Sequence, residues 1–213
     1  MKTYIYILLV LIFIGCSNDG KNSQLEQEEE VVLTKEEKLI QLYNTTLVPL
    51  FSRYEALEIP SEFQIIEQDL GVNAGAAFGY VEVSRGLVNC TEESIQLFAL
   101  THEVAHIATL HQASLFNLEG FLSEGPQLNA YKKAEYLADL IAVHLIKSKA
   151  PLFFEDLKSN FHILKLILGS ETFTHPSGTD RIKQINKYIN LSTTKTNNIA
   201  FKELYLNIWN NSI

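Results

Sequence analysis

Residues 99–111, ALTHEVAHIATLH, are the part of the chain that most restricts how it can fold. The stretch is apolar on nearly every face and predicts a buried helix, so its polar side chains need partners there. His102 and His106 share one face, at a separation that one tetrahedral ion can bridge. Glu103 lies about 100° further round, where it would hold a water rather than bind the ion. Two interpretations stay open: a metal site, or a buried helix with two hydrogen-bonded core histidines.

A catalytic metal site needs a third protein ligand and an open position for water. An elongated form of the motif carries a third histidine, but Thr109 and Gln112 stand where that form has glycine and histidine. The best candidate is Glu135, in AEYLAD on the next predicted helix, with Asp139 four residues later on the same face. Asp139 would then accept the remaining N–H of a metal-bound histidine. The alternative is two solvated carboxylates on an amphipathic helix, although apolar residues surround both.

The first fifteen residues, MKTYIYILLVLIFIG, form an apolar run behind one lysine and precede Cys16. The run is too short and too near the N-terminus for a typical spanning helix, and it predicts a secretory signal. A small residue before a cysteine resembles the bacterial lipoprotein cleavage box, in which the cysteine is lipidated and becomes the mature N-terminus. Phe13 stands where that box usually has leucine. An uncleaved anchor is the alternative, and both interpretations place the domain outside the cytoplasm, tethered to a membrane.

Residues 16–33 are polar and then acidic, and they predict a flexible tether to a single domain over residues 34–213. Removal of residues 1–15 takes away one of the 17 basic residues and leaves 16 against 25 acidic ones, a net charge of −9. This charge argues against nucleic acid as a partner, because nucleic acid needs a basic footprint. If Cys16 is acylated, Cys90 has no disulfide partner. Cys90 is then a small residue near a helix start, with a reactive thiol as the alternative.

The rest of the chain alternates between helical periodicity and a few short strands. Thr34 begins the first helix in a capping box, and Pro49 should kink or split that helix. Strands are predicted at 63–68 and 79–84, separated by a loop of small residues at 71–78. The remaining predicted helices span residues 131–148, 153–168, 174–189 and 200–211. Many helices and few strands predict an α+β fold, a mainly helical domain with a small β-sheet.

Three segments, HEVAH, EYLAD and THPSGTDRI, follow one another in this order along the chain. Together they resemble the M48 family of zinc metallopeptidases, and its soluble or lipid-anchored members more than its multi-spanning ones. The upstream stretch VNAGAAFGYVEVSRGLV is similar to a family segment that contains an edge strand and an Arg-Gly-Leu turn. The resemblance covers about residues 62–189. It implies a zincin-like fold in which an edge strand borders the active-site cleft.

The resemblance also implies a role for each matching residue. His102, His106 and Glu135 would hold one zinc ion per chain. Glu103 would be the general base and then the acid toward the leaving amine, and Asp139 would orient a zinc-bound histidine without binding the ion itself. The strand from residue 79 to residue 84 would be the edge at which an extended substrate pairs. Its substrate-binding residues would be Gly79, Tyr80, Val81, Glu82 and Val83.

His175 and Arg181 match the family's segment of His-Pro followed by arginine. A cation or an imidazole at the cleft could stabilise the oxyanion that forms when water attacks a peptide carbonyl. In some relatives the corresponding histidine occupies the open zinc position and holds the enzyme latent, which is a second hypothesis for His175. For Arg181 the alternative is a salt bridge that ties the last helix to the core.

These expectations describe an exported, lipid-anchored zinc endopeptidase of the bacterial cell envelope that hydrolyses extended or misfolded envelope proteins. The alternative is a non-catalytic binding or assembly factor that keeps this fold and holds extended clients without cutting them. The intact Glu103 argues against the alternative, because a pure binding protein has no need of the base. Zinc is inferred from the ligand types, and cobalt or manganese could fill the same site in vitro.

Overall fold

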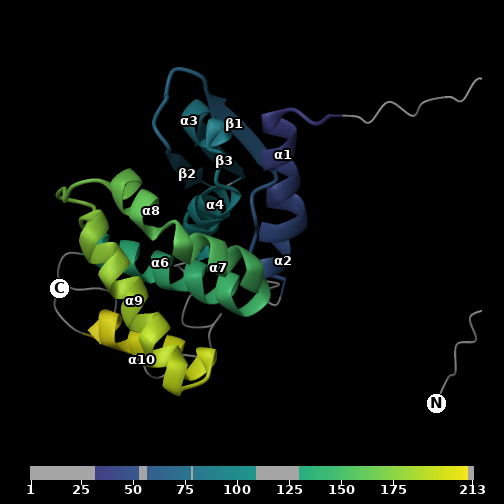
Figure 1. The fold of residues 1–213 in the computed structure, drawn as a ribbon. Helices are drawn as coiled ribbons and strands as arrows, with labels where there is room; N and C mark the ends of the chain where they lie inside the picture. Colours follow the sequence, from purple (N-terminus) through teal and green to yellow (C-terminus); the bar gives the residue numbers. More distant parts are fainter. Residues whose placement is uncertain (1–31, 53–56, 78, 109–129, 211–213) are drawn as a thin grey trace, which may run out of the picture. The chain divides into compact units, whose positions relative to one another are not determined.

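The computed structural model describes residues 32–52, 57–77, 79–108 and 130–210, and Leu33–Ile213 form one compact unit (Figure 1). The described elements are, in order, α1 (Lys35–Leu42), η1 (Tyr43–Leu47), α2 (Val48–Leu50), β1 (Glu62–Ile66), β2 (Ala74–Ala77), β3 (Tyr80–Ser84), α3 (Arg85–Asn89), α4 (Glu93–Ala108), α6 (Ala130–Lys149), α7 (Pro151–Ser159), α8 (Phe161–Leu168), α9 (Gly178–Thr194) and α10 (Asn197–Asn210). Most described residues are helical, and the described strands form one small sheet. The predicted α+β class is confirmed.

The first helical segment changes its winding just ahead of Pro49. Thr34 caps α1 by a reciprocal pair of hydrogen bonds with Glu37, which is the predicted capping box. The π-helical segment η1 follows, and α2 ends one residue after Pro49. Proline has no backbone N–H and its ring crowds the preceding turn, so a wider turn accommodates it.

The sheet has the strand order β1–β3–β2, with β1 parallel and β2 antiparallel to β3. β3 is therefore the central strand, and its Val81 and Val83 are fully buried. The prediction of an edge strand at residues 79–84 was wrong, because both sides of β3 are paired. Gly79 lies in the turn between β2 and β3 at a φ of 92°, a conformation that favours glycine.

The strand β2, one of the two edge strands of the sheet, comes from the stretch predicted to be a loop. Its sequence, AGAA, has a low intrinsic preference for strands. In the fold these small residues let β2 pack against α4 while it pairs with β3. Tertiary packing therefore overrides the local preference of residues 74–77.

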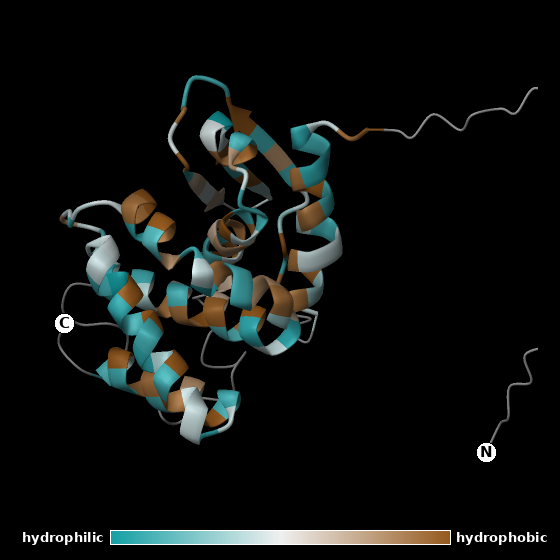
Figure 2. Ribbon diagram, in the orientation of Figure 1, coloured by the Kyte–Doolittle hydropathy of each residue, from teal (hydrophilic) through white to brown (hydrophobic). Residues whose placement is uncertain are grey.

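Helix α4 lies at the centre of the domain and contacts α1, η1, α6, α7 and β2. Figure 1 shows α4 almost end-on, with the sheet on one side and α6 on the other. Ile95, Leu97, Leu100 and Val104 have no exposed surface. Figure 2 shows apolar positions gathered where α4 meets its neighbours. The predicted buried helix is confirmed, and its polar residues lie inside the domain.

A close backbone contact holds α8 against the start of α9. Gly178 N donates a hydrogen bond to Gly169 O at 2.9 Å. A Cβ atom built on Gly178 would lie only 2.2 Å from Lys165 O, so a side chain at this position would push the two helices apart. Ser177 caps α9 by accepting a hydrogen bond from Asp180 N. The position of α8 is therefore set by its contact with α9.

None of the described helices is both long enough and apolar enough to cross a membrane. The predicted signal at residues 1–15 and the predicted lipidation site Cys16 lie outside the described residues, as does nearly all of the predicted tether. The assignments made for this part of the chain stay predictions.

The free energy of unfolding should depend on pH through a buried histidine. The ring of His144 packs against Phe201 with 4.4 Å between ring centroids, and its Nδ1 lies 2.9 Å from the Tyr188 hydroxyl. Burial, together with the charges of Lys147 and Lys149, lowers the pKa of His144 to about 4. An unfolded histidine has a pKa of about 6.5, so between these values the unfolded chain binds more protons.

We therefore expect stability to fall as the pH drops from about 6.5 to about 4, with a contribution from this residue of about 3 kcal/mol. Urea denaturation across this range should show a shallower pH dependence for His144→Gln than for the wild type. His162 is exposed, so His162→Gln is the matched control and should keep the wild-type slope. Equal slopes for wild type and His144→Gln would contradict the prediction.

Candidate metal centre

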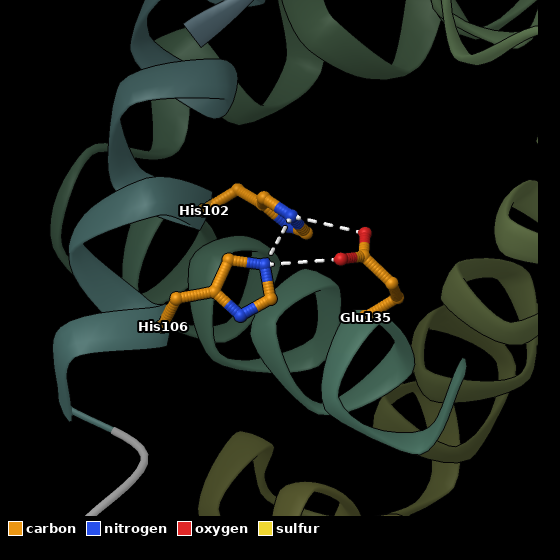
Figure 3. Close-up of side chains that lie close together, drawn as sticks. All are labelled: His102, His106 and Glu135. Atoms are coloured by element: carbon orange, nitrogen blue, oxygen red, sulfur yellow. Dashed lines mark hydrogen bonds and ion pairs between the residues drawn. The ribbon is translucent and has the colours of Figure 1, made fainter. Parts of the chain in front are cut away.

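Three side chains from two helices converge on one point (Figure 3). His102 and His106 lie one turn apart on α4, and Glu135 projects towards them from α6. His102 Nε2 is 3.0 Å from His106 Nε2 and 3.3 Å from Glu135 Oε2, and His106 Nε2 is 3.2 Å from Glu135 Oε1. His102 and Glu135 are buried, and His106 is half-buried. Their donor atoms are close enough together to hold a metal ion.

The donor atoms also fit such an ion chemically. With ligand bonds of about 2.0–2.1 Å, two donors of a tetrahedron stand about 3.4 Å apart, close to the separations seen here. Glu135 Oε2 is buried and accepts no hydrogen bond of good geometry, although His102 Nε2 and Arg181 Nη1 lie 3.3 and 3.2 Å away. A buried oxygen left in this state is costly. A cation between the three side chains would satisfy it.

The charges around the centre favour a cation at the same point. Burial alone would lower the pKa of His102, but its close contacts with the carboxylates of Asp139 and Glu135 raise it to about 9. Burial alone would raise the pKa of Glu135, but its contacts with the two histidines and the charge of Arg181 hold it far below its usual range. Both pKa shifts have one cause, the attraction between opposite charges. The carboxylates favour a positive charge at the point where the ligands meet. A divalent cation would supply that charge.

Asp139 contacts the ring nitrogen of His102 that faces away from the centre. Its Oδ1 lies 2.9 Å from His102 Nδ1, and its side chain is fully buried. Burial alone would raise the pKa of Asp139, but the charge of Arg181 and the hydrogen bonds of Arg181 and His102 hold it below its usual range. The carboxylate therefore keeps a proton on Nδ1 and leaves Nε2 as the donor atom for a metal. This is the contact that the spacing of Glu135 and Asp139 predicted.

Arg181 joins α9 to this centre and is itself buried. Its Nε and Nη2 bind the two oxygens of Asp139 at 2.8 and 2.6 Å, and Nη1 lies 3.2 Å from Glu135 Oε2. This forked arrangement matches the geometry of a carboxylate and holds both acids in place. The salt bridge that was the alternative interpretation of Arg181 is present. A direct role of Arg181 toward a substrate stays a prediction.

Glu103 borders the same cleft, one residue after His102 on α4. Burial raises the pKa of Glu103, the charges of His102 and His106 act against that rise, and the charge of Glu135 adds to it. A carboxylate with a raised pKa is a stronger base near neutral pH. Glu103 thus lies beside the three side chains that could hold a metal ion without being one of them.

His175 lies at the mouth of the cleft, on the loop between α8 and α9. Its side chain is 53% exposed, and its Nε2 lies 3.6 Å from Glu135 Oε1. Thr174 Oγ1 contacts His175 Nδ1 at 2.7 Å, and Thr172 Oγ1 accepts a hydrogen bond from His175 N at 3.0 Å. Sequence reasoning missed both threonines. The spacing Thr-x-Thr-His was the local signal, because short hydroxyl side chains readily bond to backbone and neighbours in turns.

The cleft that contains these groups has a volume of about 320 Å³. Besides the groups above, it is lined by residues that precede or begin β2 and by apolar residues of α4 and α8. They are Val72, Asn73, Ala74, Ile95, Phe98, Ala99, Leu164, Ile167 and Leu168, and Ser170 just after α8 completes the lining. The predicted substrate-binding residues Gly79, Tyr80, Val81, Glu82 and Val83 are not part of this lining. The reason is the strand order, because β2 and not β3 is the strand at the cleft.

A scan against models of known protein families gave no match, and neither did searches of curated proteins and of solved structures. The chemistry available to the site therefore follows from its own geometry.

Replacement of Arg181 by methionine should destabilise the fold strongly. The change would leave Asp139 buried without its cation, and breaking a buried ion pair costs about 3–5 kcal/mol. Arg85 is the matched control, because it also pairs with two carboxylates, Glu36 and Glu67, but at the surface. We expect a much smaller loss for Arg85→Met in urea denaturation. Similar losses for the two variants would contradict the view that Arg181 organises the centre.

Proposed function

We propose that the protein is a zinc-dependent endopeptidase. The observation that carries the proposal is the convergence of His102, His106 and Glu135 at one point of a cleft that also contains Glu103. Two imidazoles and one carboxylate form a common ligand set of catalytic zinc, which keeps a further position for water or substrate. A glutamate that borders such a site without binding the ion is available for proton transfer.

The choice of zinc rests on the ligand types. Imidazole suits zinc, copper, iron and nickel, whereas hard cations such as magnesium and calcium prefer sets made only of oxygen. The separations of the donor atoms favour a tetrahedral ion. A zinc ion held there would polarise a peptide carbonyl and lower the pKa of a water.

The side chains of this chain then divide the remaining work. Glu103 would take the proton of the attacking water and pass it to the leaving amine, for which its raised pKa is suited. His175, at the mouth of the cleft, would hydrogen-bond the developing oxyanion, or hold the enzyme latent by occupying the open metal position. Asp139 and Arg181 would not contact the ion. They are positioning residues that hold His102 and Glu135 in their orientations.

An extended substrate would pair with the free edge of β2. Ser84 N donates to Asn73 O at 3.0 Å, so Asn73 faces β3. In an antiparallel pair, successive residues point their backbone N–H and C=O groups alternately towards and away from the partner strand. The N–H and C=O groups of Ala74 and Ala76 therefore point away from β3. Among the described strands none pairs with that side of β2. A substrate strand added there would run into the cleft, because Ala74 is part of its lining.

The resemblance of HEVAH, EYLAD and THPSGTDRI to the M48 family supports this proposal. It also supports the proposal of a zincin-like fold. The predicted signal and Cys16 would place the enzyme on the bacterial envelope through an N-terminal lipid. Recognition of backbone along an edge strand suits polypeptides that are extended or misfolded, so quality control of envelope proteins is the proposed role.

Replacement of Glu103 by glutamine should abolish hydrolysis while the metal stays bound. We expect a loss of about 10²–10⁴-fold in kcat/KM toward a labelled unfolded polypeptide, the usual contribution of a general base. Glu93→Gln, an exposed position on the same helix, is the matched control and should retain wild-type activity. Metal content measured on both variants separates loss of the base from loss of the ion.

The same experiment separates the enzyme from a binding or assembly factor of this fold. If the wild type and Glu103→Gln bind the unfolded polypeptide equally and neither cuts it, the proposed hydrolysis is wrong. The protein would then hold extended clients without cleaving them.

The position of the substrate strand can be tested at Ala76. Proline at this position removes an N–H on the free edge of β2, where proline is tolerated. Loss of one such hydrogen bond, about 1 kcal/mol, should raise KM by about fivefold. Ala76→Ser keeps the N–H and serves as the control. Equal KM values for the two variants, both folded by circular dichroism, would show that substrates do not pair with β2.

A further inference from the structure

We propose that the cleft contains a subsite for a bulky apolar side chain of the substrate, next to the bond that is cut. The subsite lies between α4 and α8, and Ile167 and Leu168 form the wall that selects this side chain. This inference rests on the proposed peptidase function, and it names the class of substrate residue that the site accepts.

The floor of the subsite comes from the same face of α4 that carries the metal ligands. Ala99 lies three residues before His102 and four residues before Glu103 on α4. It is therefore on the same side of the helix as these two residues, about one turn, or roughly 5.4 Å, along the axis. Ile95 and Phe98 continue the apolar floor and are fully buried, and Ala99 is half-buried. The ring of Phe98 lies 6.1 Å from the ring of His102 between centroids. A side chain that flanks a peptide bond held at Glu103 would reach this floor.

The opposite wall comes from the last turn of α8. Ile167 and Leu168 are half-buried and line the cleft, and Leu164 below them is buried. The contact of Gly178 with Lys165 O and Gly169 O holds this turn in place. The wall is therefore preformed by the packing of α8 on α9 and does not depend on a substrate to order it.

The charges of the cleft decide which side chain fits. Among the described residues of its lining, the ionisable ones are those of the metal centre and its edge, Glu103 and Arg181 included. Between α4 and α8 the lining is apolar. A charged substrate side chain placed there would lose its water without gaining a partner, which is costly. An apolar side chain would gain from leaving water, in proportion to the area it buries.

The test is a peptide library cleaved by the purified full-length protein loaded with zinc, with cut sites identified by mass spectrometry. We expect cuts beside leucine, isoleucine, phenylalanine or methionine. Ile167→Glu should lower kcat/KM at these sites by about tenfold or more and favour lysine or arginine in their place. Leu166→Glu makes the same chemical change one residue earlier, at a position that is 75% exposed and outside the cleft lining. It should leave the preference unchanged.

Ile167→Ala is a second variant that keeps the test valid if Ile167→Glu does not fold. It enlarges the subsite without adding a charge. It should shift the preference from leucine toward larger side chains such as phenylalanine. Cleavage by the wild type without regard to side chains would overturn the inference, and so would equal effects of Ile167→Glu and Leu166→Glu.

A binding measurement keeps the subsite and the peptidase function apart. Fluorescent peptides that differ only in a central leucine or aspartate are titrated onto the zinc-loaded Glu103→Gln variant. A preference of tenfold or more for leucine, lost on adding Ile167→Glu, supports the subsite even if the wild type cuts nothing and the peptidase proposal fails. Equal affinities for the two peptides contradict the subsite even if the wild type is an active peptidase.

Discussion

The buried ion pair between Arg181 and Asp139 is the interaction on which the rest of the site depends. It brings a cation from α9 and an anion from α6 out of water, and such a pair is stable only when both partners are well hydrogen-bonded. Asp139 meets this condition by also binding His102, and Arg181 meets it by also contacting Glu135. One pair of charges therefore ties three helices together and orients two of the three candidate metal ligands.

Small residues provide the second constraint, because they decide how closely the other elements approach this centre. The AGAA strand packs against α4 and keeps its outer edge beside the cleft, and Gly178 lets α8 pack closely on α9. The cleft thus lies between a strand edge made of small residues and an apolar helical wall. Its polar groups come from the charge network, and its shape comes from these close contacts.

The candidate metal ligands could be predicted from the sequence because their spacing is a property of single helices. His102 and His106 share a face wherever α4 lies, and the same holds for Glu135 and Asp139 on α6. The strand at which a substrate is proposed to pair could not be predicted in this way. The alternating residues of β3 predict a strand, but its place in the sheet depends on pairing with residues distant in the sequence. The cleft wall at residues 167–168 depends in the same way on the packing of α8 against α9.

We propose that His102, His106 and Glu135 hold a zinc ion. Metal content by mass spectrometry on the purified full-length protein tests it most directly, with Glu135→Ala as the variant. Glu171→Ala, at an exposed glutamate paired with Lys132, is the control. We expect about one zinc per chain in the wild type and the control, and loss of zinc in Glu135→Ala. A folded wild-type protein that retains no zinc after resupply would contradict it.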